Sequence, residues 1–222
     1  EAEPAVLLRG DVVDGNPLLD YESSHGGNCR SRAAGVARAF KRIESAQPAG
    51  ARSNLVRSVR GGVRGMPEDE EVVIIRDVLP EDLPILFEYQ RQPAANAMAA
   101  FPARDWDTFV AHWAKISNDE NAITRAVVLQ GEVAGNIGSW EQDGRREIGY
   151  WIGMEHWGKG VATKAVSALL RQVETRPLYA HVAKHNVASL RVLQKCGFRI
   201  VEEEPPGSRV GDDVEELVMR LA

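Results

Sequence analysis

The sequence has few of the features that would indicate a membrane, secreted or metal-binding protein. Its 222 residues include two cysteines, Cys29 and Cys196, which lie far apart and have no neighbouring Cys or His at metal-ligand spacing. No apolar run approaches the roughly 18 residues that a membrane span requires. Residues 1–10 lack the basic flank, apolar stretch and cleavage site of a secretory signal. We therefore expect a cytoplasmic protein without a membrane contact or a metal site.

The charge is modest overall but unevenly distributed along the chain. Hydrophobic residues make up 44% and charged residues 27% of the sequence, which is ordinary for a globular protein. The net charge is -5, yet residues 1–65 carry 10 Lys and Arg against 7 Asp and Glu, and the remainder carries 17 against 25. An acidic second part does not resemble a nucleic-acid binder, and it favours a cationic partner over an anionic one.

The chain divides into two regions at about residue 65. Residues 1–65 are rich in Gly, Ala and Arg, end in a glycine-rich stretch at 61–65, and contain one basic amphipathic pattern at 31–46. That pattern could contact nucleic acid, but we favour a solvated extension that is either disordered or not native, with Met66 as a candidate start. Residues 66–222 form the predicted folded domain.

Within that domain, hydrophobic periodicity alternates between strands and helices. Apolar spacing of 3.6 predicts helices from Pro80, over 105–116, after residue 160 and from Asn186. Short apolar runs predict strands at 72–75, 123–130, 133–140, 146–153, 178–183, 198–202 and 214–221. The order predicts an α+β (mixed α/β) fold, a mixed sheet with helices on both faces.

The most informative segment is the loop from Trp157 to Thr163, between a strand and a helix. Gly158 and Gly160 permit positive φ and close approach of a ligand, while a helix start offers unpaired N–H groups and the positive end of the dipole. This combination predicts a phosphate-binding turn. The loop lacks the Walker string, and Thr163 stands where the dinucleotide fingerprint needs a third glycine. An ordinary strand-to-helix turn is the alternative.

In its sequence context this loop resembles the acetyl-CoA loop of the GNAT acetyltransferase superfamily, [QR]-x-x-G-x-[GA]. Trp157, Gly160 and Ala162 fill those positions, with Trp in place of the usual Gln or Arg. The loop 157–163 and the segment 186–198 resemble those of the branch that includes the ribosomal-protein N-terminal acetyltransferases, and the strand 147–152 is a third match. The resemblance implies a mostly antiparallel sheet of six to seven strands over residues 66–222.

The resemblance also implies acetyl-CoA as cosubstrate, an amine acceptor and no metal. The pantetheine arm would pair with backbone of 150–152, and the diphosphate would bind N–H groups of 158–162. The implied cofactor-binding residues are Tyr150, Trp151, Ile152, Trp157, Gly158, Lys159, Gly160, Val161, Ala162, Thr163, Asn186 and Ser189. Two of these have alternatives: Lys159 as a solvated lysine and Asn186 as a helix cap.

Three residues are candidates for the proton transfers that acetyl transfer requires. Glu147 and His181 are candidate bases. The alternative for Glu147 is a charged residue at the end of a hairpin, and the alternative for His181 is a hydrogen-bonded histidine within a strand. Some relatives protonate the leaving thiolate with a tyrosine at the position that resembles Leu193, so Ser189 is the substitute candidate. The backbone N–H near Trp151 is the expected oxyanion donor, and Cys196 is interpreted as buried packing.

The resemblance thus implies acetyl transfer from acetyl-CoA to a primary amine of a small molecule or a protein N-terminus, by direct attack in a ternary complex. The alternative is a non-catalytic acetyl-CoA sensor. The sequence leaves the acceptor open and leaves a homodimer as one option. We expect no nucleic-acid partner.

Overall fold

The computed structural model describes residues 6–7, 72–205 and 214–222. The basic pattern at 31–46, the stretch at 61–65 and Met66 lie outside the described residues. The division into an extension and a domain therefore stays a prediction. No helix in the described part of the chain has the length and apolar character needed to cross a bilayer.

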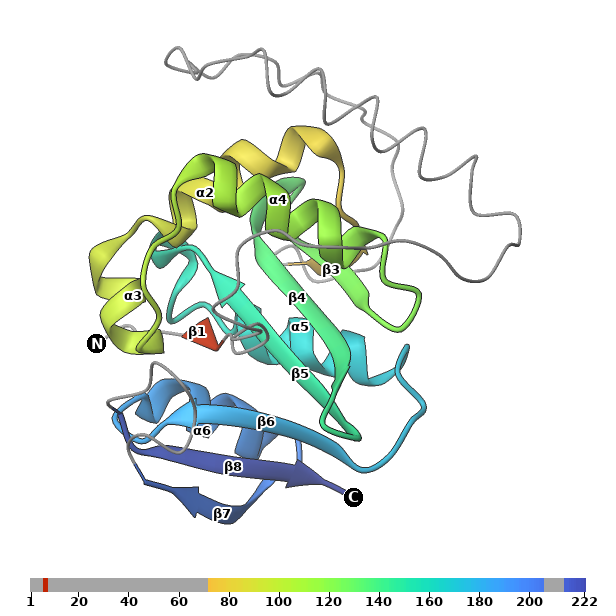
Figure 1. Ribbon diagram of the computed structural model, residues 1–222, viewed down its shortest axis with the longest axis vertical. Helices are drawn as coiled ribbons and strands as arrows, with labels where there is room; N and C mark the ends of the chain where they lie inside the picture. Colours follow the sequence, from red (N-terminus) through yellow and green to blue (C-terminus); the bar gives the residue numbers. More distant parts are fainter. Residues whose placement is uncertain (1–5, 8–71, 206–213) are drawn as a thin grey trace, which may run out of the picture.

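The core of the molecule is a sheet with the strand order β2-β3-β4-β5-β6-β8-β7 (Figure 1). A two-residue strand, β1, pairs with β5 outside this order. Neighbouring strands are antiparallel except for β5 and β6, which run parallel. The strands are β1 (Val6–Leu7), β2 (Val73–Asp77), β3 (Ile123–Leu129), β4 (Glu132–Gln142), β5 (Arg145–Ile152), β6 (Leu178–Ala183), β7 (Arg199–Glu204) and β8 (Glu216–Leu221). The predicted mixed, mostly antiparallel sheet is confirmed.

Tight turns set the register of the two hairpins that lead to β5. Gln130 and Gly131 have φ of 51° and 92°, and Asp143 and Gly144 have φ of 51° and 73°. Two successive positive φ values are typical of the two-residue turns whose twist matches that of paired strands. Each turn therefore fixes which β5 side chains face which side of the sheet.

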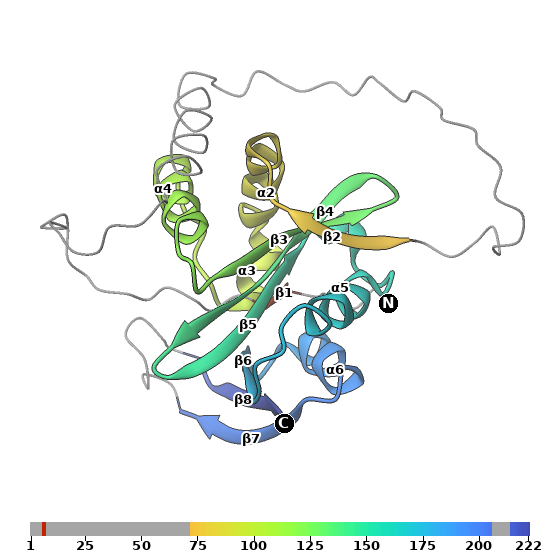
Figure 2. The same cartoon turned by 90° about the vertical axis from the view of Figure 1, so that its right-hand side faces the viewer.

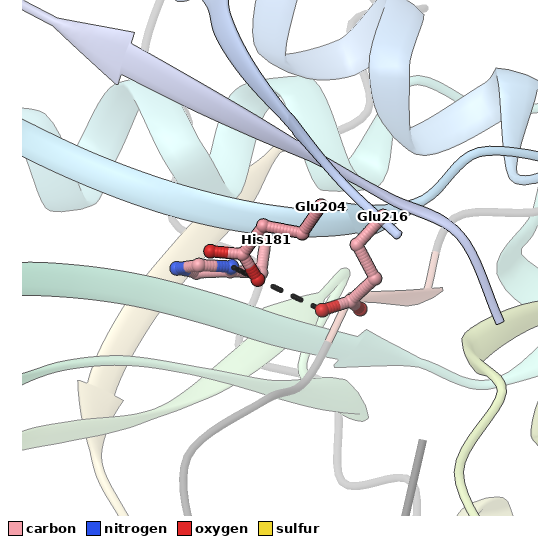
Figure 3. Close-up of side chains that lie close together, drawn as sticks. All are labelled: His181, Glu204 and Glu216. Carbon is pink, nitrogen blue, oxygen red and sulfur yellow. Dashed lines mark ion pairs between the residues drawn. The ribbon is translucent and has the colours of Figure 1, made fainter. Parts of the chain in front are cut away.

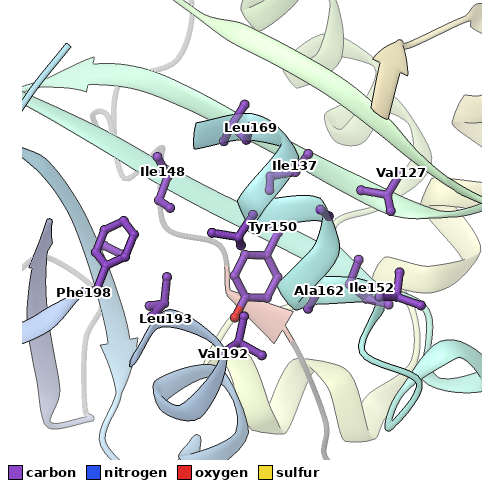
Figure 4. Close-up of a cluster of buried hydrophobic side chains, with 14 of the residues drawn as sticks. Val127, Ile137, Ile148, Tyr150, Ile152, Ala162, Leu169, Val192, Leu193 and Phe198 are labelled. Atoms are coloured by element: carbon purple, nitrogen blue, oxygen red, sulfur yellow. The ribbon is translucent and has the colours of Figure 1, made fainter. Parts of the chain in front are cut away.

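Helices cover both faces of the sheet (Figure 2). α5 (Val161–Leu170) and α6 (Val187–Lys195) pack on one face, where Ile148, Tyr150 and Ile152 enter a large apolar core (Figure 4). α2 (Leu83–Gln90), α3 (Pro93–Ala99) and α4 (Trp106–Ser117) form the second core with Trp151. Alternation along β5 thus sends Trp151 to the opposite face from its neighbours.

Two features of this layer differ from the sequence expectation. The helix expected to open at Pro80 begins as a short 3₁₀ turn, Pro80–Asp82, which leads directly into α2. α3 was not predicted, because its sequence of small residues has no apolar stripe and it buries mainly Ala95 and Ala99.

Candidate functional site

The two halves of the sheet meet at β5 and β6, where the strands pair over a very short length. Arg146 pairs with Leu178 and Glu147 with Tyr179, and the parallel ladder ends there. From Ile148 onward β5 continues beside β4, while β6 follows β8. The strands therefore separate beyond Glu147. One edge of β5 is left without β6 over the residues expected to meet the pantetheine arm.

The loop that follows β5 ends at an open helix N-terminus. Gly158 and Gly160 have φ of 74° and 71°, and Gly160 is the N-cap of α5. Within the part of the chain that the structure describes, an added Cβ at Gly160 would meet no atom within 4 Å, and no side chain caps α5. The first N–H groups of α5 are therefore available to an anion, as a phosphate-binding turn requires.

Trp157 explains how this loop tolerates Trp in place of Gln or Arg. Its Nε1 donates a hydrogen bond to the Ile152 carbonyl at 2.8 Å, and its ring packs against both apolar cores. The indole thus anchors the start of the loop to the end of β5.

The remaining loop residues offer a ligand their backbone more than their side chains. In the first turn of α5, the side chains of Val161 and Ala162 are buried in the first core, and that of Thr163 is half-buried. Lys159 is exposed, which suits either a phosphate contact or simple solvation. Backbone N–H groups are therefore the main hydrogen-bond donors that this helix start can offer a ligand.

The side chains of Tyr150, Trp151 and Ile152 are fully buried. Trp151 Nε1 donates to the Tyr89 carbonyl at 3.0 Å, so the indole belongs to the second core and does not line an open acceptor pocket. Burial raises the pKa of Tyr150, whose hydroxyl lies beside Ser189. Any contact of this stretch with a cofactor is therefore made by its backbone.

Glu147 and His181 lie together where β5 and β6 separate. His181 Nε2 is 3.1 Å from Glu147 Oε1, and both side chains are buried. Glu147 is the last β5 residue paired with β6, and His181 lies two residues beyond its partner Tyr179. The short pairing of β5 with β6 thus brings together the two residues that were predicted as candidate bases.

Two further carboxylates approach the other nitrogen of the same imidazole (Figure 3). His181 Nδ1 is 3.6 Å from Glu204 Oε2 and 3.9 Å from Glu216 Oε2. Glu204 and Glu216 sit opposite each other in the pairing of β7 with β8. Like charges placed directly across a strand pair repel, so this position favours a bound cation.

Glu204 and Glu216 carry no local sequence signal that marks them as site residues. Ligand atoms from His181, Glu204 and Glu216 all lie within 4.8 Å of one another, a spacing that could hold a metal ion. The same oxygen and nitrogen atoms could equally accept hydrogen bonds from an ammonium group. The expectation of no metal therefore stays a prediction.

Asn186 and Ser189 lie at the start of α6. Asn186 Oδ1 accepts a hydrogen bond from the Ser189 backbone N–H at 3.1 Å, so Asn186 is a helix cap. Ser189 is buried near Tyr150, on the α5 and α6 side of the sheet, whereas His181 faces the other side. The three catalytic candidates thus form two groups on opposite faces of the sheet: Glu147 with His181 on one face, and Ser189 on the other. Leu193 is fully buried in the first core, and Cys196 is half-buried.

Comparison with known proteins gives the family. A family model described as an acetyltransferase (GNAT) domain matches residues 73–199. The uncharacterized N-acetyltransferase p20 of Bacillus licheniformis is 35% identical over 63 residues, which are 27% of this chain and 35% of that protein. The chain therefore matches about a third of the length of this curated relative.

Solved structures share the fold at low sequence identity. Spermidine N-acetyltransferase from Vibrio cholerae, in complex with CoA and spermine, has a TM-score of 0.60 and 18% identity, covering 67% of this chain and 94% of that one. An aminoglycoside acetyltransferase in complex with coenzyme A and kanamycin has a TM-score of 0.57 and 20% identity. The match covers 68% of this chain and 95% of that one. These matches do not distinguish the branch of ribosomal-protein N-terminal acetyltransferases. Because the family model covers more than half of the sequence, the chain belongs to the GNAT acetyltransferase family.

Proposed function

We propose that this protein transfers an acetyl group from acetyl-CoA to a primary amine of a small cationic molecule, by direct attack in a ternary complex. The observation that carries the proposal is the buried contact of 3.1 Å between His181 and Glu147, at the point where β5 and β6 separate. A protein N-terminus is the alternative acceptor, and the experiment below distinguishes the two.

The cofactor would bind along the edge of β5 that β6 leaves beyond Glu147, and at the start of α5. The diphosphate would accept hydrogen bonds from backbone N–H groups of 158–162, next to the open space at Gly160. The pantetheine amides would pair with the β5 edge at 150–152, as a further strand would. The two solved relatives named above are complexes with coenzyme A, which supports this placement.

In the proposed reaction the amine nitrogen attacks the thioester carbonyl carbon, the C–S bond breaks, and the thiolate leaves. An ammonium cannot attack, so the amine must first lose a proton. The Glu147–His181 pair would accept that proton. Ser189, on the opposite face of the sheet and beside Tyr150, would donate its hydroxyl proton to the thiolate. It would regain a proton from the acylated nitrogen, which after the attack carries one proton more than the amide, so the products are the amide, the free thiol of CoA and the protonated Glu147–His181 pair. A backbone N–H of β5 near Trp151 would stabilise the oxyanion.

The carboxylates around His181 support a cationic acceptor. Glu147, Glu204 and Glu216 approach one imidazole from both of its sides. An ammonium group gains charge-assisted hydrogen bonds with carboxylates at such a position. The solved relatives include complexes with spermine and kanamycin, so acceptors with several amines are the first to test.

The experiment is a panel assay that follows release of free thiol from acetyl-CoA. The panel contains spermidine, kanamycin, a monoamine and short peptides with a free α-amine. For the best acceptor, Glu147→Gln and His181→Asn should each lower kcat by about 100-fold or more, the size expected for loss of a general base. Glu202→Gln, an exposed residue of β7, is the matched control and should leave kcat unchanged.

The outcomes separate the alternatives. Turnover of multi-amine molecules, with a higher KM in Glu204→Gln and Glu216→Gln, supports the proposal. Turnover of peptides alone would overturn the small-molecule acceptor in favour of a protein N-terminus. Binding of acetyl-CoA without turnover of any amine would overturn the enzymatic proposal and indicate a sensor.

A further inference from the structure

The edge of β5 that β6 leaves is occupied by another part of the chain. Val6 pairs with Trp151 and Leu7 with Tyr150, in antiparallel register, to form β1. β4 pairs with the same two β5 residues along the other edge, through Asn136 and Ile137. A strand has two edges, so β1 must lie on the edge that β6 uses at Glu147. Figure 1 shows β1 beside β5, where β5 and β6 diverge.

This is the edge to which the proposed function assigns the pantetheine arm. An extended peptide and a pantetheine arm both present amide N–H and C=O groups along their length, so both suit the unpaired backbone of a sheet edge. The two cannot pair with the same groups of Tyr150 and Trp151 at once. Occupation by β1 and binding of acetyl-CoA are therefore mutually exclusive along this stretch.

We infer that the β5 edge at Tyr150 and Trp151 is a peptide-binding edge, and that the chain's own strand Val6–Leu7 competes there with acetyl-CoA. The inference rests on the proposed function for the position of the pantetheine arm. Because β1 is tethered to the sheet, it binds as an intramolecular competitor. Because it is only two residues long, it remains displaceable.

The test compares two double variants of the full chain. Val6→Pro with Leu7→Pro removes both backbone N–H donors of β1 and disfavours an internal strand. Val6→Thr with Leu7→Thr is the matched control, because it keeps the donors and the strand preference. In calorimetry with acetyl-CoA, the proline variant should bind about three- to tenfold more tightly than the wild type, a size set by one or two net backbone hydrogen bonds. The threonine variant should bind like the wild type.

A second measurement tests the edge directly. A synthetic peptide of residues 1–12, added to the proline variant, should raise the apparent Kd for acetyl-CoA, and the same peptide with Pro at positions 6 and 7 should not. Equal affinity of wild type and proline variant, together with no effect of the peptide, would overturn the inference while leaving the proposed function standing. Failure of every variant to bind acetyl-CoA would overturn both. Matching circular dichroism spectra ensure that the variants are compared in the folded state.

Discussion

Gly160→Glu should remove most acetyl-CoA binding while leaving the protein folded. The added side chain enters open space, since a Cβ at Gly160 meets no atom of the described residues within 4 Å. The loss in free energy of unfolding therefore comes mainly from placing a non-glycine residue at φ 71°, which costs about 1–2 kcal/mol. A carboxylate about 5 Å from a phosphate charge costs about 1–3 kcal/mol at an effective dielectric constant of about 20 to 80. Binding should weaken by about 5- to 150-fold, before the loss of close backbone approach is added.

Gly144→Glu is the matched control for this substitution. Gly144 has φ 73°, its added Cβ also meets no atom within 4 Å, and it lies in the turn between β4 and β5. Both variants should lose similar stability in thermal unfolding, but only Gly160→Glu should lose affinity in calorimetry with acetyl-CoA. Equal affinities in the two variants would refute the assignment of this loop to the diphosphate.

Three further predictions concern the cap, the thiol and the cation site. Asn186→Ala should lower the free energy of unfolding by about 0.5–2 kcal/mol in urea titration, because the Ser189 N–H loses its acceptor; an unchanged midpoint would contradict the capping role. Burial raises the pKa of Cys196, so stability should fall as pH rises through the ordinary range of thiol ionisation. In a Cys29→Ser background, iodoacetamide should accordingly alkylate Cys196 more slowly in the folded protein than in urea, and equal rates would argue against protection of this half-buried thiol. Finally, acetyl transfer should survive treatment with EDTA; a loss that added Zn²⁺ or Mn²⁺ restores would indicate that the carboxylates around His181 hold a metal.

The sheet and the helices of the first core were predictable because their signals are local. The stretch 161–170 carries an apolar stripe at helical spacing, and the glycine after α6, Gly197, has φ 93° as a helix-ending glycine should. The turns at Gly131 and Gly144 also mark the hairpins in the sequence itself. α3 escaped prediction because a run of alanines buries little and repeats no pattern.

The acidic cluster could be predicted only in part, because it depends on contacts between strands distant in sequence. Glu147 and His181 were found through resemblance to a family motif. Glu204 is the last residue of an acidic run that is typical of a solvent-exposed strand, and Glu216 directly precedes an apolar run. Their proximity arises from the pairing of β6, β8 and β7, which no local pattern encodes. β1 was missed for the same reason, since two apolar residues carry no periodicity.

The short parallel ladder between β5 and β6 places a limit on how stable this fold can become. Substitutions that prolonged the ladder past Glu147 would add backbone hydrogen bonds and strengthen the junction between the two halves of the sheet. They would also close the gap at which the proposed function places the cofactor and the acyl transfer. Selection for thermal tolerance in this protein should therefore act on the outer strands and the helices, and leave the centre of the sheet incompletely paired.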